Sequence, residues 1–197
     1  VYLLNDTQTY GQGVAQAFTT EAKKIGLTVL SDGAAGAGWD AKQSDYTALF
    51  TKIKALAPDM VYVGGIFDNN GGQLVKDKVA VLGDNTKVAF MGPDGFTGYP
   101  DLNKMPEAQG MYLSFAGLST DLLLANDPKG AGATFVKSYK KTYKKDPVGS
   151  YPLYGVAAVQ VILAAIAKSD GTRKGVNNAV FSGSGISIPA KQSVLGK

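Results

Sequence analysis

The sequence predicts an α/β protein, a doubly wound parallel sheet with helices on both faces. Short apolar segments alternate with helical patterns from residue 1 to about residue 115. Three of these segments end in a polar or glycine-rich loop before the next helix begins, which is the order found in parallel sheets with right-handed crossovers. Ligands of such sheets bind beside the loops at the carboxyl ends of the strands.

The opening stretch shows this order most clearly. Val1 to Leu4 form an apolar run that predicts the first strand. A polar loop follows and ends at Tyr10-Gly11. A helix is then expected, because apolar residues recur at helical spacing: Val14, Phe18, Ala22 and Ile25.

The following segments predict four more strands and two more helices. A glycine- and alanine-rich loop, 31–40, is expected after the second strand. Pro58 is expected to end the second helix and Gly83 the third. The strands are expected at 27–30, 60–63, 88–91 and 111–115, and the helices around 46–53 and 74–82.

The pattern changes after about residue 118, which predicts a division into 1–118 and 119–197. Helices are expected at 133–145, 151–167 and 173–181, followed by weak strand signals. The helix at 151–167 is apolar nearly all round and should therefore be buried. This half has no sheet of its own that could cover the helix. We therefore expect the apolar surface of the helix to be covered in a homodimer or by an exchange of segments between two copies.

The composition excludes several classes of function. The chain has 45% hydrophobic residues and a net charge of +4, which is too small to indicate nucleic-acid binding. It has no His and no Cys, which removes the usual general base, the thiol nucleophiles and the commonest metal ligands. We therefore expect neither an enzyme nor a metal or cofactor site.

Two motifs have ordinary structural interpretations. Gly11-Gln-Gly13 resembles part of a dinucleotide fingerprint, but Gln16 stands where the third glycine belongs. The glycines are better explained by the turn into the helix. Five lysines between 137 and 145 are expected to form a solvated helix face, with nucleic acid or an anionic membrane as less favoured alternatives.

Three acids follow strand ends, and Asp94 is the most informative of them. Asp94 lies between Gly92-Pro93 and Gly95, so its carboxylate is expected to project from a strand end toward a ligand ammonium. Asp6 and Asp68 occupy similar positions. Acid–base catalysis, Mg²⁺ binding and simple turn capping remain alternatives for these carboxylates.

Several segments in this order resemble the branched-chain amino-acid binding proteins of ABC importers, which have the type I periplasmic binding fold. The resemblance is close to about residue 115 and continues to Gln160. The segments that carry it are Asn5 to Gly13, Asp45-Tyr-Thr-Ala-Leu, Lys52-Ile-Lys, Pro58-Asp-Met-Val, Gly64-Gly65, Phe90 to Gly95, Glu107-Ala-Gln-Gly-Met-Tyr, Tyr143 to Pro147 and Tyr151 to Gln160.

The resemblance implies two α/β lobes joined by a hinge, with the ligand held between them. Residues 1–118 would be the second, ligand-binding lobe. Residues 119–197 would be the hinge crossover and the helical C-terminal part of an incomplete first lobe. The chain opens on a strand residue without Met, so we expect a fragment of a longer protein with a secretion signal.

The resemblance also implies the ligand contacts. Tyr10 matches the tyrosine that borders the ligand, and Tyr151 matches an aromatic residue that lines the pocket from the other lobe. Asp94 stands where the family usually has a glutamate for the ligand ammonium. Ile66 stands where leucine-binding members have an aromatic residue, and Phe67 beside it is expected to compensate.

The expected function is therefore capture of an amino acid, branched-chain or related, for delivery to an ABC permease. The expected location is periplasmic or extracellular, with a lipoprotein anchor as one option. Two alternatives remain, namely a ligand-sensing domain of a receptor or transcription regulator with the same fold, and an enzyme on a Rossmann-like sheet.

Overall fold

The computed structural model describes residues 1–182. The chain divides into two compact units, Val1–Phe115 and a second that begins at Ala116. The strand signals expected after residue 181 lie outside the described residues.

The first unit is a five-stranded parallel sheet in the order β2-β1-β3-β4-β5. This is one of the doubly wound orders, and the direction of winding reverses between β1 and β3. The fold class predicted from the sequence is confirmed. The strands are β1 (Tyr2–Asn5), β2 (Ala37–Gly38), β3 (Met60–Gly64), β4 (Ala89–Gly92) and β5 (Tyr112–Leu113).

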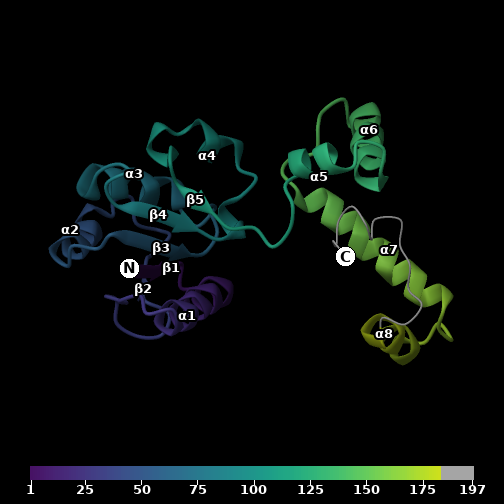
Figure 1. Ribbon diagram of the computed structural model, residues 1–197, viewed down its shortest axis with the longest axis horizontal. Helices are drawn as coiled ribbons and strands as arrows, with labels where there is room; N and C mark the ends of the chain where they lie inside the picture. Colours follow the sequence, from purple (N-terminus) through teal and green to yellow (C-terminus); the bar gives the residue numbers. More distant parts are fainter. Residues whose placement is uncertain (183–197) are drawn as a thin grey trace. The chain divides into compact units, whose positions relative to one another are not determined.

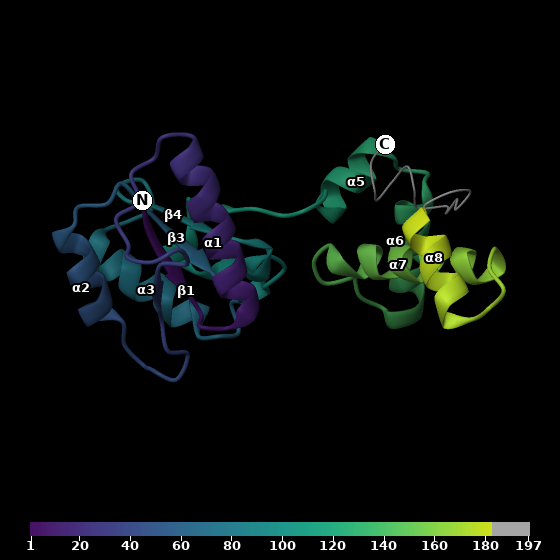
Figure 2. The same cartoon turned by 90° about the horizontal axis from the view of Figure 1, so that it is seen from below.

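Helices cover both faces of this sheet. Helix α1 (Thr9–Lys24) lies on one face, and α2 (Thr47–Ala55) and α3 (Gly71–Leu82) lie on the other (Figures 1 and 2). Short helical turns, η1 (Asp94–Phe96), α4 (Pro100–Lys104) and η2 (Pro106–Ala108), connect β4 to β5.

The alternation of side chains along the strands builds one core on each face. Leu3 of β1 and Tyr62 of β3 pack with Ala15 under α1, where the Phe18 ring stacks on Tyr62 with 4.1 Å between the ring centroids. The neighbouring strand residues point to the larger core under α2 and α3, which includes Leu4, Val61, Val63, Phe50 and Leu74. A strand buried on both faces explains why 60–63 is apolar throughout.

The prediction of a strand at 27–30 is wrong. That segment runs beside Val1, whose amino group donates to Thr28 O at 2.8 Å and whose carbonyl accepts from Leu30 N at 2.9 Å. The strand next to β1 is instead β2, within the predicted loop, and its Ala37 aligns with Leu4. Glycine is needed just before it, because Gly36 has φ +72 and a Cβ there would lie 2.3 Å from Leu3 O.

The second unit consists of helices within the described residues. They are α5 (Thr120–Asn126), α6 (Ala131–Tyr143), α7 (Tyr151–Ala167) and α8 (Arg173–Ser182). Hydrogen bonds hold the start of this unit to the N-terminal end of α7. Tyr154 Oη accepts from Leu118 N at 2.7 Å, and Thr120 N donates at 2.9 Å to Oγ of Ser150, the residue just before the helix.

The expectation that α7 is buried holds only for part of its circumference. Leu153, Ala157 and Ala165 are buried. Four large apolar side chains of the same helix are 45–59% exposed: Val159, Ile162, Leu163 and Ile166. Among the described residues, no helix is long and apolar enough to cross a membrane.

Candidate functional site

The loops after β1, β3 and β4 converge at the carboxyl edge of the first unit. Tyr10 lies in the first turn of α1, Ile66 follows β3, and Asp94 opens η1 after β4. Strands β1 and β3 are adjacent, and the winding of the sheet reverses between them. Doubly wound proteins bind their ligands in the crevice at such a point.

Tyr10 and Asp94 are in direct contact. The Tyr10 hydroxyl donates a hydrogen bond to Asp94 Oδ1, and Gly95 N donates to the same hydroxyl at 3.3 Å. The Tyr10 side chain is 39% exposed, so its ring borders solvent at this edge. The structure therefore brings together the carboxylate and the aromatic ring that the sequence singled out.

Gly95 allows the loop after β3, which carries Ile66, to lie close to the turn after β4. A Cβ at Gly95 would lie 2.3 Å from Gly65 O and 2.9 Å from Ile66 Cγ2. Any side chain at position 95 would therefore push the two loops apart. Ile66 is partly exposed and lies beside Gly95, whose backbone N donates to the Tyr10 hydroxyl.

Phe67 follows a different course from its neighbour. Its backbone N donates to Gly95 O at 2.9 Å, which joins the loops after β3 and β4. Its ring packs on Tyr99 and Phe96, with centroid separations of 4.8 and 6.0 Å. The ring therefore supports the site from within the first unit, and its contact with a ligand stays a prediction.

The three acids at strand ends have three separate environments. Asp68 Oδ2 accepts from the Tyr99 hydroxyl at 3.1 Å. Asp6 is 2% exposed and accepts hydrogen bonds from Ile66 N at 3.1 Å and Asn69 Nδ2 at 2.7 Å. Within residues 1–182, no group of three or more acidic side chains is arranged to hold a metal ion.

The charge of Asp94 also acts on Tyr62 of β3. Burial raises the pKa of Tyr62 to about 12, and the negative charge of Asp94 contributes in the same direction. The sequence alone did not single out Tyr62, because an aromatic residue in an apolar strand looks like ordinary core. Only the pairing of β3 with β4 shows that the carboxylate of Asp94 lies near Tyr62.

Tyr151, the remaining predicted site residue, is the first residue of α7 in the second unit. Its side chain is 48% exposed. Its place opposite Tyr10 stays a prediction from the family resemblance.

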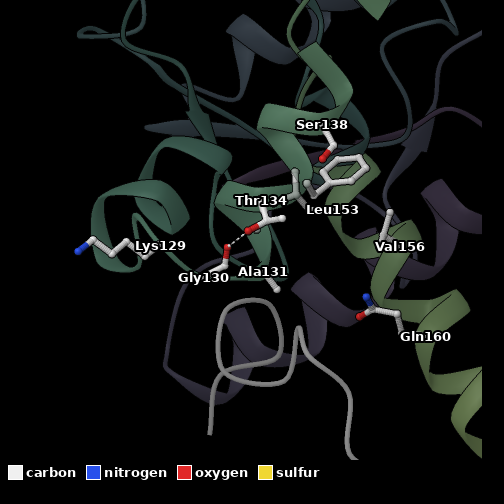
Figure 3. A pocket seen from close by; sticks show the side chains of 10 residues that line it. Lys129, Gly130, Ala131, Thr134, Ser138, Leu153, Val156 and Gln160 are labelled. Carbon is white, nitrogen blue, oxygen red and sulfur yellow. Dashed lines mark hydrogen bonds between the residues drawn. The ribbon is translucent and has the colours of Figure 1, made fainter. Parts of the chain in front are cut away.

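The second unit contains a cavity that the sequence does not predict. It has a volume of about 550 Å³ and lies between the start of α6 and the first half of α7 (Figure 3). Leu153, Val156 and Phe135 form its apolar lining, and the Thr134 hydroxyl beside them donates to Gly130 O at 3.1 Å. None of the predicted site residues lines it.

The lysines of α6 are all exposed, as the sequence predicts. Lys140 pairs with Asp146 at 3.1 Å. The rings of Phe135, Tyr139 and Tyr143 pack against one another along the same helix, with centroid separations of 5.8 and 4.6 Å. This arrangement is that of a solvated helix face.

Known proteins similar to this chain are binding proteins. The Leu/Ile/Val/Thr-binding protein of Salmonella typhimurium is 30% identical over 175 residues, which are 86% of this chain and 42% of that protein. The Leu/Ile/Val-binding protein of Escherichia coli K12 is 29% identical over the same length. The chain thus spans less than half the length of these curated relatives.

Solved structures share the fold at low sequence identity. A leucine-binding protein from Thermotoga maritima superposes with a TM-score of 0.70 and 18% identity, over 91% of this chain and 48% of the other. A fatty acid ABC transporter substrate-binding protein from Thermomonospora curvata gives a TM-score of 0.64 and 18% identity, over 92% of this chain and 46% of that one.

The family model described as periplasmic binding protein matches residues 1–186, which is nearly the whole chain. Its members bind substrates and are not enzymes, as the sequence predicted for this chain. The chain therefore belongs to the periplasmic binding protein family.

Proposed function

We propose that the protein captures an amino acid in a cleft between two lobes and delivers it to an ABC permease. The observation that carries this proposal is the Tyr10 and Asp94 pair at the carboxyl edge of the sheet. Asp94 holds the ligand's α-ammonium through a charge-assisted hydrogen bond, Tyr10 packs against the ligand, and Ile66 borders its side chain. Tyr151 contributes from the other lobe.

The carboxylate favours an amino acid over other ligands of the fold. The relatives include proteins named for leucine, isoleucine, valine and threonine, but a fatty-acid binding protein shares the fold. A fatty acid carries no cation for Asp94 to bind, and its own carboxylate would be repelled. The aliphatic Ile66 suits a ligand with a small or branched apolar side chain.

Capture is coupled to closure of the lobes. The ligand enters the cleft while the lobes are open. Rotation about the hinge then closes the lobes around it. The permease would recognise the closed form. This role implies a periplasmic or extracellular location, with a lipoprotein anchor in the parent protein as one option.

Isothermal titration calorimetry on the full-length protein tests this function. The panel contains leucine, isoleucine, valine, threonine, alanine and octanoate. We expect an aliphatic amino acid to bind, and Asp94→Asn to weaken binding at least tenfold, because a charge-assisted hydrogen bond contributes about 1.5–3 kcal/mol.

Asp68→Asn is the matched control, since that carboxylate is bonded to Tyr99 and not to Tyr10. Its affinity should equal that of the wild type. Binding of octanoate alone, or equal losses in the two variants, would contradict the proposal.

A further inference from the structure

A buried carboxylate lies directly behind the candidate site. Asp6 follows β1, is 2% exposed, and accepts three hydrogen bonds from the loops around it. Gln8 N donates to Oδ1 at 3.1 Å, while Ile66 N and Asn69 Nδ2 donate to Oδ2 at 3.1 and 2.7 Å. Hydrogen bonds of this kind offset the cost of removing an ionised carboxylate from water.

These bonds, together with one from Trp39, join segments that follow three different strands. Asn69, in the loop after β3, also accepts from Trp39 Nε1 through its backbone carbonyl at 2.8 Å. Trp39 directly follows β2. Asp6 therefore connects the loop after β1 to the loop after β3 directly, and to the end of β2 through Asn69.

Two glycines lie so close to Asp6 that neither position could carry a side chain. Gly65 has φ +158, and a Cβ there would lie 2.7 Å from both Asp6 Oδ2 and Trp39 Cη2. A Cβ at Gly11, in the first turn of α1, would lie 2.0 Å from Asp6 Oδ1. Asp6 is thus packed against the loop that precedes Ile66 and against the helical turn that carries Tyr10.

The same loops continue to Asp94. Gly65 O packs against Gly95, Phe67 N donates to Gly95 O at 2.9 Å, and Gly95 N donates to the Tyr10 hydroxyl. A displacement of the loop at 65–67 would therefore move the backbone of Gly95 and, with it, the partner of Tyr10. The contacts run without interruption from Asp6 to the Tyr10 and Asp94 pair.

We infer that Asp6 is a positioning residue for the ligand site. By holding Ile66 N and Asn69, it fixes the loop after β3 and the first turn of α1 in the geometry that joins Tyr10 to Asp94. Asp6 does not contact the ligand itself, because its oxygens are buried and face backbone and amide donors. This inference rests on the proposed amino-acid binding function.

The first test is Asp6→Asn in the full-length protein. The two side chains have nearly the same shape, but one acceptor oxygen becomes an NH₂ group that faces other donors. We expect amino-acid affinity to fall about tenfold to hundredfold, as the loss of hydrogen bonds to a charged group predicts. Backbone amides of Ile66 and Gly95 should exchange with deuterium faster in the absence of ligand.

A matched control separates positioning from general stability. Asp77 is also buried and accepts from Tyr46 N at 2.7 Å and from Gln73 Nε2 at 2.9 Å, on the side of α2 and α3. Asp77→Asn should lower the unfolding temperature while leaving affinity and the exchange of Gly95 unchanged.

A rescue experiment tests the key hydrogen bond. Combining Asp6→Asn with Asn69→Asp exchanges the donor and the acceptor between the two positions. This double variant should recover part of the lost affinity. If Asp6→Asn does not fold, Asn69→Ala is used instead, because it removes one of the three hydrogen bonds and should cost a few-fold in affinity.

The outcomes distinguish this inference from the proposed function. Wild-type affinity and unchanged exchange at Ile66 and Gly95 in a folded Asp6→Asn or Asn69→Ala variant would overturn the positioning role. A wild-type protein that binds no amino acid would overturn the proposed function. The ligand-free exchange measurement would still decide whether Asp6 orders the loops.

Discussion

The Tyr10 hydroxyl donates a hydrogen bond to Asp94 Oδ1 across 84 positions of sequence. The bond joins the first turn of α1 to the turn that follows β4. If an amino acid binds here as proposed, its ammonium would meet a carboxylate that this bond already orients. Such preorganisation lowers the entropic cost of binding, because the side chain is ordered before the ligand arrives.

Tyr10→Phe keeps the ring and removes the donor to Asp94. We expect amino-acid affinity to fall about threefold to tenfold, the effect of one hydrogen bond of roughly 0.5–1.5 kcal/mol. Calorimetry measures the loss. Tyr112→Phe serves as the control, since Tyr112 is 61% exposed on β5 and should not alter binding. Equal affinities for Tyr10→Phe and wild type would contradict the role of the hydroxyl.

Two glycines of α1 should respond oppositely to alanine. A Cβ at Gly11 would lie 2.0 Å from Asp6 Oδ1 and 2.5 Å from Gly64 O, whereas a Cβ at Gly13 would meet nothing within 4 Å. Overpacking predicts that Gly11→Ala lowers the free energy of unfolding by about 1–3 kcal/mol. Gly13→Ala should raise it by about 0.5–1 kcal/mol, because alanine is the better helix former.

Urea unfolding of both variants gives the two free energies under the same conditions. The comparison has an internal control, since both substitutions add one methyl group to the same helix. A stable Gly11→Ala variant would mean that Asp6 and β3 can move away from α1 at little cost. That result would also weaken the role assigned to Asp6.

The strands that could be predicted from the sequence are those whose own side chains form an apolar run. The apolar runs at 1–4 and 60–63 identify central strands because the sheet buries both of their faces. β2 could not be predicted in the same way, because Ala37 and Gly38 carry no large or β-branched side chain. Its position depends on the close approach of Gly36 to Leu3, which only the folded backbone reveals.

The residues of the candidate site could be predicted to a similar extent, although their contact with a ligand stays a prediction. Position at strand ends, together with the family resemblance, identifies Tyr10, Ile66 and Asp94, and the structure brings these three together. The role proposed for Asp6 could not be predicted, since an acid after a strand looks like any turn residue. Its burial depends on Gly65 and Asn69, which are about sixty residues away in sequence.

Lys78 of α3 is completely buried and holds the connection to β4. Its ammonium donates to Asn85 Oδ1 at 2.8 Å, to Gly83 O at 3.2 Å and to Asp84 O at 3.3 Å, and it also contacts Val88 O. Lys78→Met leaves these acceptors without a donor, which should cost about 2 kcal/mol of unfolding free energy.

Lys76→Met, at an exposed position of the same helix, should change stability by less than about 0.5 kcal/mol. Chemical denaturation at pH 7 compares the two variants. Similar stabilities for both would show that the carbonyls around Lys78 find other donors. In that case the buried ammonium would not be needed to hold the connection between α3 and β4.

Lys78 and Tyr62 also make stability depend on pH, in opposite directions. Burial lowers the pKa of Lys78 from 10.5 to about 8, so the unfolded chain binds more protons between these values. The contribution of Lys78 to stability therefore rises as pH increases from about 8 to 10.5.

Burial raises the pKa of Tyr62 from 10.0 to about 12, so the unfolded chain loses its proton first. The stability contributed by this residue is present below pH 10 and is lost as pH rises to about 12. Tyr62→Phe should therefore unfold less readily than wild type above pH 10, with little difference at pH 7. If the difference in unfolding free energy between Tyr62→Phe and wild type stayed the same from pH 7 to 12, the hydroxyl of Tyr62 would not be buried in its un-ionised form.

The apolar face of α7 predicts self-association of the 197-residue chain. Val159, Ile162, Leu163 and Ile166 recur at helical spacing and are each about half exposed. A contiguous apolar patch of this kind is usually covered by a partner. We expect sedimentation velocity to show a dimer whose population rises with concentration, through face-to-face packing or an exchange of segments.

Val159→Lys with Leu163→Lys should shift the distribution to monomer, because two charges would have to be buried in the contact. Ile25→Lys is the control, since Ile25 is 71% exposed on the first unit and should leave association unchanged. A single monomeric species at all concentrations in the wild type would contradict the prediction. An equal shift caused by Ile25→Lys would place the contact elsewhere on the chain.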